Sequence, residues 1–434
     1  MTTNRWVIHN GKFAVNQGTE WTVVQGYMVV EDDKIVHIGE TLPDGDESLP
    51  KVDGKGLVFL PGLINTHGHA AMSLLRGHGD DLALQVWLQE KMWPMEAKMT
   101  SEDVYWGTSL SVLEMLKGGT TAFLDMYDHM DQVAKVVEQS GIRAALARGV
   151  IGLCSEEEQM RKLQESAAFA REWNGQAGGR ITTIISPHAP YTCPPDYIEK
   201  LVQVAHDLDL PLHTHMSETL REVEQNVADY GMRPVAHLEK LGFFSRPSLV
   251  AHAVHLNDEE IDILARHDVA VSHNPGSNLK LASGVARVPD LLKAGVTVSL
   301  GTDGPASNNN LDMFEEMRLA ALIHKGVSGD PTAVPAGEAL LLGTGYGAKS
   351  IFLNNTGALQ VGMKADFIAL NIEQAHFYPH TDLISHTIYS ASAKDVEHVW
   401  VDGKQLVKHG ECLTMDEERI LRESQLAFDG LLAR

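Results

Sequence analysis

The pattern of apolar and polar residues separates the two ends of the chain from its centre. The first 58 residues form short apolar runs with alternating polar positions, such as RWVIHN and GYMVVEDDKIVHIG, divided by Gly, Asn and Asp turns. This pattern is typical of β-strands. It returns from residue 361, where DVEHVWVDGKQLVKHG contains a hairpin turn, and the charged stretch 415–434 has helical periodicity. We therefore expect residues 1–58 and 361–434 to form one small discontinuous β-sandwich-like domain, with a helix at the C-terminus.

The region between these ends, residues 59–360, alternates short apolar runs with longer helical stretches such as 101–117, 131–139 and 221–229. Such alternation is typical of parallel β/α architecture, and eight β/α units match a TIM-type (β/α)8 barrel in the α/β class. The eight candidate strands are 57–65, 120–127, 143–151, 180–187, 210–216, 248–254, 268–273 and 296–302.

Polar residues gather where these candidate strands end. Active sites of such barrels lie at the C-terminal ends of the strands, so the sequence predicts that these side chains share one rim. They are His67, His69, Asp125, Tyr127, Arg148, His188, His213, His215, Glu218, His252, His255, His273, Asn274 and Asp303.

The tripeptide His67-Gly68-His69 indicates a metal site. Residues two apart on an extended segment point to the same side, and neutral imidazole is the commonest protein ligand for zinc. An isolated pair carries little weight among 21 histidines. Together with His215 and Asp303, however, it makes a plausible mononuclear site with one position open for water. A second metal is not expected, because the stretch 182–192 lacks the lysine that bridges binuclear barrels of related design.

Several polar residues have two interpretations. His213 is either a supporting residue beside His215 or part of the core, and Asp125 either orients a ligand histidine or is a buried hydrogen-bonding carboxylate. His255 and His273 are expected in loops or around the site. The remaining histidines are interpreted as structural; these are His206, His237, His267, His324, His376, His380 and His386.

The composition of the chain limits the kinds of partner and cellular setting that we expect for it. A formal charge of −23 disfavours nucleic acid and anionic membranes as partners. The three cysteines are far apart and form no CxxC motif, which favours a reducing cytoplasm over a disulfide framework. The start MTTNRWVIHN lacks the pattern of a signal peptide, and no apolar run reaches the length of a membrane span.

The chain resembles the amidohydrolase superfamily and, within it, the family of 5-methylthioadenosine/S-adenosylhomocysteine deaminases. The resemblance covers nearly the whole chain. It is carried by PGLINTHGHAAMSLLRG (61–77), WLQEKMWPMEAKMT (87–100), SPHAPYTC (186–193), LHTHMSET (212–219), VAHAVHL (250–256), SHNPGSNLKLASG (272–284) and LGTDGPASNNNLDMFEEMR (300–318).

The resemblance implies hydrolytic deamination of the adenine 6-amino group in 5'-methylthioadenosine, S-adenosylhomocysteine or adenosine, giving the inosine analogue and ammonia. It implies one zinc per subunit, with Fe²⁺ or Mn²⁺ as alternatives, held by His67, His69, His215 and Asp303. Asp303 would also accept a proton from the attacking water, Glu218 would shuttle protons to the substrate, and His252 would hydrogen-bond the water. Glu96 would bind the ribose hydroxyls, and Arg148 and His188 would contact substrate.

Other functions stay open. An s-triazine chlorohydrolase or aminohydrolase, or a guanine-type base deaminase, would use the same metal chemistry, although Glu96 favours a substrate with a sugar. A barrel that holds metal only for stability is disfavoured, because structural zinc sites are closed by four ligands and lack a spare acid. The apolar residues Met72, Leu74, Leu75, Leu88 and Trp93 either receive a methylthio group or belong to the helix core. A homodimer is expected.

Overall fold

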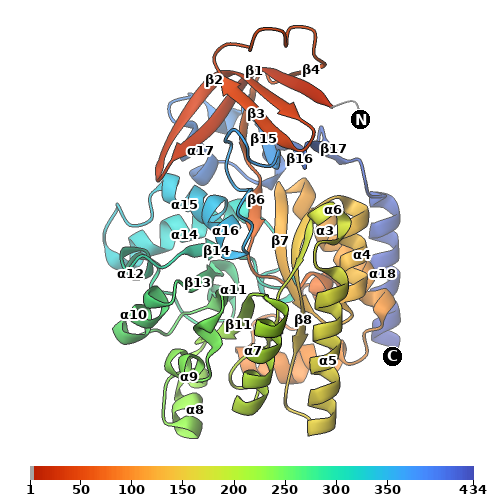
Figure 1. Cartoon of the computed structure of the whole chain (residues 1–434), viewed down its shortest axis with the longest axis vertical. Helices are drawn as coiled ribbons and strands as arrows, with labels where there is room; N and C mark the ends of the chain where they lie inside the picture. The colour runs from red at the N-terminus through yellow and green to blue at the C-terminus, as the bar shows by residue number, and fades with distance from the viewer. Residues whose placement is uncertain (1–3) are drawn as a thin grey trace.

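The computed structural model describes residues 4–434, and it confirms the (β/α)8 barrel fold (Figure 1). The first three residues of the predicted segment 1–58 lie outside the described residues. Within residues 4–434, both ends of the chain join one nine-stranded sheet at the top of Figure 1. Its strands are β1 (Arg5–Gln17), β2 (Glu20–Glu31), β3 (Lys34–Gly39), β4 (Lys51–Asp53), β5 (Leu57–Pro61), β15 (Phe367–Asn371), β16 (Val396–Val401), β17 (Lys404–Lys408) and β18 (Glu411–Cys412).

The two ends of the chain meet where β5 pairs antiparallel with β15. Aromatic rings from β1, β5, β15 and β16 are buried in one apolar cluster of this sheet. The centroids of Phe13 and Phe59 lie 5.1 Å apart, and those of Phe367 and Trp400 lie 4.7 Å apart. Offset stacking of this kind adds to the stabilisation from apolar burial. We propose that this sheet is the small discontinuous domain expected from residues 1–58 and 361–434.

The central region forms a closed ring of parallel strands. Two arcs of strands, β6–β10 and β11–β14, meet at a bridge between Ile185 and Leu212. The ring closes where Thr66 N donates to Leu300 O at 2.9 Å. The strands are β6 (Leu63–Asn65), β7 (Thr120–Tyr127), β8 (Arg143–Val150), β9 (Ile181–Thr183), β10 (Ser186–Pro187), β11 (Leu212–Met216), β12 (Ser248–His252), β13 (Ala270–His273) and β14 (Val298–Leu300).

Helices surround the ring, and polar caps fix where several of them begin. Thr100 and Asp103 form a capping box at the start of α3, as Asn257 and Glu260 do for α10. The longer helices are α3 (Ser101–Lys117), α4 (Met130–Ser140), α5 (Glu156–Trp173), α7 (Pro195–Leu208), α8 (Leu220–Tyr230), α9 (Pro234–Lys240), α10 (Asp258–Arg266), α14 (Met313–Ser328), α15 (Ala336–Leu342), α17 (Leu383–Tyr389) and α18 (Glu417–Ala433).

Short helices complete the connections between the strands. A π-helical turn, η2, lies between α1 and α2 in the segment that follows β6. The short helices are η1 (Ala70–Leu75), α1 (Leu84–Val86), η2 (Trp87–Met92), α2 (Trp93–Glu96), α6 (Gln176–Gly179), η3 (Phe243–Ser245), α11 (Pro275–Lys280), α12 (Val288–Lys293), α13 (Pro305–Asn308), α16 (Gly345–Ser350), η4 (Ala375–Phe377) and η5 (Ala393–Asp395).

The C-terminal helix α18 lies against the barrel helix α3, away from the nine-stranded sheet (Figure 1). Lys117 Nζ contacts a Glu417 carboxylate oxygen at 2.7 Å, and Ser424 Oγ donates to Trp106 O at 3.1 Å. In the part of the chain that is described, no helix is both long and apolar enough to cross a membrane.

Two predicted strands are divided in the structure. The predicted strand 57–65 is β5 in the nine-stranded sheet followed by β6 in the barrel, with Gly62 between them. A Cβ at Gly62 would overlap the Thr121 side chain, so glycine lets the chain pass closely from one sheet to the other. The predicted strand 180–187 is likewise β9 and β10. Apolar periodicity did not detect either interruption, because the intervening residues are also buried.

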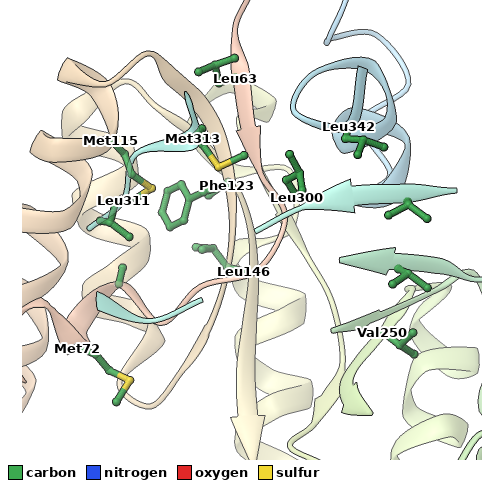
Figure 2. Close-up of a cluster of buried hydrophobic side chains, with 14 of the residues drawn as sticks. Leu63, Met72, Met115, Phe123, Leu146, Val250, Leu300, Leu311, Met313 and Leu342 are labelled. Atoms are coloured by element: carbon green, nitrogen blue, oxygen red, sulfur yellow. The ribbon is translucent and has the colours of Figure 1, made fainter. Parts of the chain in front are cut away.

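A continuous apolar core lies between the ring and its helices and holds the strand ends in place. Figure 2 shows Leu63, Phe123 and Leu146 from adjacent strands packing beside Met115 and Met313. Each of these five side chains is buried. Close packing of this kind resists displacement of any one strand, so the side chains at the strand ends are held by a rigid base.

A buried ion-pair network connects the barrel to the nine-stranded sheet and predicts a large mutational effect. Arg143, at the start of β8, contacts Asp366 at 2.8 Å and Asp402 at 2.6 Å. Replacing Arg143 by Leu leaves the buried Asp366 carboxylate without its cation, whereas Asp402 keeps Lys364 at 3.2 Å. We expect a loss of about 3–5 kcal/mol in the free energy of unfolding by urea. The exposed Arg161, which pairs with Glu158 and Glu165, is the control. Its change to Ala should have no measurable effect, and equal losses in the two variants would contradict a special role for the buried network.

Candidate active site

The C-terminal ends of β6, β11 and β14 bring four predicted residues together. Asp303 Oδ1 lies 3.3 Å from His67 Nε2 and 3.3 Å from His69 Nε2. His215 Nε2 lies 3.3 Å from His69 Nε2. The Asp303 side chain and the His67 ring are buried, and the backbone N–H of Asp303 donates to His67 O at 3.0 Å. Residues that lie 236 positions apart in the chain therefore meet through the closure of the ring.

His252, from the end of β12, also faces this cluster. One ligand atom each from His67, His215, His252 and Asp303 lie within 4.8 Å of one another. His252 Nδ1 lies 2.9 Å from Asn278 Oδ1. Because an amide oxygen only accepts, Nδ1 is the donor in this contact, and in the neutral form of the ring this leaves the lone pair of Nε2 facing the cluster.

The outer nitrogens of two cluster histidines are held by backbone carbonyls. His69 Nδ1 donates to Met126 O at 2.7 Å, and His215 Nδ1 donates to His188 O at 2.7 Å. A carbonyl can only accept, so Nδ1 of each ring is protonated and Nε2 is turned inward. Burial lowers the pKa of His69, but the nearby Asp303 carboxylate raises it to about 9, so a cation bound here would displace a proton from His69 Nε2. With Nδ1 protonated, a neutral ring offers Nε2 for metal coordination.

Asp303 is oriented in the same way. Its Oδ2 accepts from Ser277 Oγ at 2.7 Å and from Ser307 Oγ at 2.8 Å, while Oδ1 faces the histidines. Burial opposes ionisation, but the nearby rings of His67 and His69 hold the pKa of Asp303 well below its usual range. The carboxylate is therefore a fixed negative charge within reach of the imidazoles.

The donor set fits one divalent cation. His67 Nε2 is buried and has no hydrogen-bond partner, although it faces Asp303. A buried lone pair without a partner is costly unless something occupies its direction. Burial lowers the pKa of His67 to about 4, so this ring is neutral at pH 7. Imidazole nitrogens with one carboxylate oxygen suit zinc and several other first-row metals.

Glu218 lies beside the cluster, just after β11. Its Oε2 is 3.8 Å from His252 Nε2, and its Oε1 accepts from Ser283 Oγ at 3.3 Å. Burial raises the pKa of Glu218 above the ordinary range of a glutamic acid. A carboxyl group that holds its proton more strongly than usual can serve as a general acid.

The position of Glu218 depends on Glu222, a residue that the strand-end pattern does not single out. Both oxygens of Glu222 accept backbone hydrogen bonds, one from Ser217 N at 2.9 Å and one from Glu218 N at 2.8 Å. Ser217 has a φ of 52°, an uncommon conformation for serine. One signal in the sequence could have pointed to Glu222. The spacing of Thr219 and Glu222 is typical of a helix start, and in the structure the Thr219 side chain caps α8 by accepting from Glu222 N.

A cavity of about 430 Å³ opens from the cluster. Glu96, Arg148, His188 and Glu218 all line it, as do the cluster histidines His69, His215 and His252. One wall is apolar and comes from the segment that includes the π-helical turn. The apolar residues on that side include Met72, Leu84, Trp87, Leu88 and Trp93. Leu74 and Leu75 belong to the apolar core.

The predicted substrate residues already have protein partners. Glu96 Oε1 accepts from Tyr127 Oη at 2.7 Å, and burial raises the pKa of Glu96. Arg148 contacts Asp128 at 3.1 Å and Glu165 at 3.2 Å, so two carboxylates balance its charge. His188 Nδ1 lies 2.9 Å from Thr192 Oγ1.

The structure also gives contacts for polar residues whose role the sequence left open. Asp125 Oδ1 accepts from Ala70 N at 2.6 Å, directly after His69, so it supports the backbone of the HxH segment. His255 Nε2 donates to Ser283 O at 2.7 Å, since a carbonyl can only accept. The ring of His273 lies against that of His324, with the two Nε2 atoms 3.3 Å apart.

Comparison with known proteins identifies the family. Residues 58–406, which make up most of the chain, match the amidohydrolase family. The chain belongs to the amidohydrolase family.

Relatives and solved structures match this chain over nearly its full length. The chain is 49% identical over 427 residues to a protein of Halalkalibacterium halodurans named 5-methylthioadenosine/S-adenosylhomocysteine deaminase, covering 97% of this chain and 98% of that one. An adenosine deaminase from Xanthomonas campestris, solved with bound zinc, has a TM-score of 0.92 and 34% identity, covering 99% of each chain. Atrazine chlorohydrolase from Arthrobacter aurescens, solved with zinc, has a TM-score of 0.90 and 26% identity, covering 97% of this chain and 99% of that one.

The buried contacts of Glu222 predict that its side chain stabilises the turn at Glu218. Changing Glu222 to Ala leaves two buried N–H groups unpaired, and we expect a loss of roughly 1–3 kcal/mol of unfolding free energy for each. Urea unfolding of the purified protein would measure it. The exposed Glu224, in the same helix, is the matched control, and its change to Ala should have no comparable effect. Equal stability of the two variants would show that the Glu222 contacts are dispensable.

Proposed function

We propose that this amidohydrolase replaces the 6-amino group of adenine by oxygen in nucleosides such as 5'-methylthioadenosine, S-adenosylhomocysteine and adenosine. The observation that carries the proposal is that one cavity joins the His–Asp cluster and Glu218 to Glu96. The first group of residues suits hydrolysis at a ring carbon, and Glu96 suits recognition of a ribose. The near full-length relative named for this deamination supports the same substrates.

Zinc is the proposed cation, one per chain, with Fe²⁺ or Mn²⁺ compatible with the same donors. His67, His69, His215 and Asp303 would hold it. When bound, it would supply a Lewis acid that makes water nucleophilic near neutral pH. A similar structure that contains zinc supports this choice.

In the first step, water adds to C6 of the adenine ring while Glu218 gives its proton to N1. Asp303 accepts one proton of the water, and His252 Nε2 accepts a hydrogen bond from the other O–H, which holds the water oxygen toward C6. Burial raises the pKa of Glu218, which favours the protonated form that this step requires. The product of this step is a tetrahedral C6 that carries both a hydroxyl and an amino group.

In the second step, the C–N bond breaks. The amino group takes the proton that Asp303 accepted and leaves as ammonia, while the C6 hydroxyl returns its proton to Glu218. N1 keeps the first proton and C6 becomes a carbonyl, which is the inosine form. Both carboxyl groups thereby regain their starting protonation states, so the cycle balances with one water consumed.

Glu96 is the proposed ribose ligand, with His188 and Arg148 as further substrate contacts. The Tyr127 hydrogen bond fixes one Glu96 oxygen, which orients the carboxylate toward the cavity. A buried carboxylate that loses its hydroxyl partners is destabilised, so substrates without a sugar should be disfavoured.

The alternative substrates on this fold are a chlorotriazine and guanine, and a panel separates them. Ammonia or chloride release would be measured with adenosine, 5'-methylthioadenosine, S-adenosylhomocysteine, guanine and atrazine. The proposal expects turnover of at least one adenine nucleoside well above guanine and atrazine. The reverse order would overturn it. Assembly as a homodimer and a cytoplasmic setting remain predictions from the sequence.

Glu218 offers a direct test of the proton transfer. Changing Glu218 to Gln keeps the shape of the side chain but removes the acid, and we expect kcat to fall about 10²–10⁴-fold. Zinc content per chain, measured by elemental analysis, should stay at the wild-type value because Glu218 is not a proposed ligand. A variant with near-normal kcat would remove Glu218 from the mechanism.

Glu96 offers a test of sugar recognition. Changing Glu96 to Ala should lower kcat/KM for adenosine about 10–100-fold, the cost of losing hydrogen bonds to a charged group. The rate with free adenine should change little. Steady-state kinetics on both substrates would measure this. Glu90 is exposed in the same segment, and its change to Ala is the control. Equal losses on nucleoside and base would contradict a ribose role.

A further inference from the structure

A buried chain of hydrogen bonds extends from His67 away from the cavity. His67 Nδ1 lies 3.1 Å from His213 Nε2, and His213 Nδ1 lies 3.0 Å from Ser186 Oγ. Ser186 Oγ also lies 2.9 Å from His213 O. None of these three side chains is exposed to solvent. The arrangement differs from those of His69 and His215, whose outer nitrogens contact carbonyls directly.

The contacts along this chain of hydrogen bonds limit where the protons can lie. His67 Nδ1 faces His213 Nε2, and His213 Nδ1 faces Ser186 Oγ, so each contact needs one donor and one acceptor. Two neutral rings in contact can distribute their protons in only two ways that leave each hydrogen bond with one donor. In one, every proton points away from the cluster; in the other, every proton points toward it.

The end of the chain of hydrogen bonds favours the first arrangement. The carbonyl oxygen of His213 can only accept, so it suits a Ser186 hydroxyl that donates to it. Ser186 Oγ then accepts from His213 Nδ1–H, and His213 Nε2 accepts from His67 Nδ1–H. The consequence is a free lone pair on His67 Nε2, the atom that faces Asp303 and has no hydrogen-bond partner.

We propose that His213 and Ser186 are positioning residues that fix the tautomer and ring orientation of His67, so that Nε2 is presented to the cation. The inference rests on the proposed cation site, but it concerns residues that touch neither the cation nor the substrate. It assigns a role to the first histidine of the HTH segment 213–215, which the sequence left as either a supporting or a core residue.

The inference requires the hydrogen-bond acceptor Nε2 of His213 and does not depend on the bulk of the ring. His213→Leu removes the acceptor, whereas His213→Gln can place an amide oxygen where Nε2 lies. Ser186→Ala removes only the hydroxyl at the far end of the hydrogen-bonded chain. His237 is the matched control, because it is a buried histidine whose ring contacts Asn226 at 3.1 Å, away from the cluster.

The experiment measures the zinc dissociation constant of each full-length variant by competition with a chromophoric chelator. We expect His213→Leu to bind zinc about 10–100-fold more weakly than wild type, the usual cost of losing a group that orients a ligand histidine. Ser186→Ala should be weakened by a smaller factor. His213→Gln and His237→Leu should stay within about threefold of wild type. The visible spectrum of the cobalt-substituted protein should change in His213→Leu and be restored in His213→Gln.

Two results would overturn the inference. One is a zinc constant within threefold of wild type in His213→Leu. The other is an equal loss in His213→Leu and His213→Gln, which would show that ring packing matters and the acceptor does not. If His213→Leu does not fold, Ser186→Ala decides, and an unchanged constant there overturns the inference. The wild type could also fail to deaminate any nucleoside while the variants keep the expected order of zinc dissociation constants. That result would contradict the proposed reaction but support the positioning role of His213 and Ser186.

Discussion

The structure depends on one constraint: several imidazole rings and one carboxylate share a dry centre at the mouth of a closed ring of strands. Buried polar atoms must be paired, so every outer atom of this cluster requires a partner. Backbone carbonyls supply it for His69 and His215, and two serine hydroxyls supply it for Asp303. The inner atoms are thereby left facing one another, which is the condition for holding a cation.

The loops around the cluster are tied together by buried carboxylates that take no part in the proposed chemistry. Glu222 holds the turn at Glu218 through two backbone N–H groups. Glu316 connects the short helices α11 and α13, since one oxygen accepts from the backbone Gly276 N at 3.0 Å and the other from the side-chain Asn308 Nδ2 at 2.7 Å. These two helices carry Ser277 and Ser307, the serines that orient Asp303. The groups of the proposed mechanism are thus positioned by carboxylates that lie outside it.

The barrel and the rim were predictable because strand and helix periodicities are local signals. The strand Thr120–Tyr127 and the helix Ser101–Lys117 have the bounds expected from the sequence. The passage at Gly62 was not predictable from periodicity, because it depends on the approach of Thr121 from another strand. The role of Glu222 was missed for a different reason: the Thr219–Glu222 spacing indicates only a helix start, and the backbone N–H groups that Glu222 binds leave no mark in the sequence. The roles proposed for the cluster residues came from strand ends and from resemblance to a family, and remain proposals.

The substrate cavity shows where sequence reasoning reaches its limit. Leu74 and Leu75 fit an apolar pocket by sequence as well as Leu88 does, yet they belong to the core, while the π-helical turn Trp87–Met92 contributes Trp87 and Leu88 to the cavity wall. The extra residue in such a turn shifts the helix face by a fraction of a turn, so the direction of each later side chain changes. The surroundings of Arg148 could not be predicted from the sequence either, because its ion pairs with Asp128 and Glu165 join three separate segments. In the proposed function, the choice of substrate therefore depends on contacts between segments, while the reaction depends on residues at the strand ends.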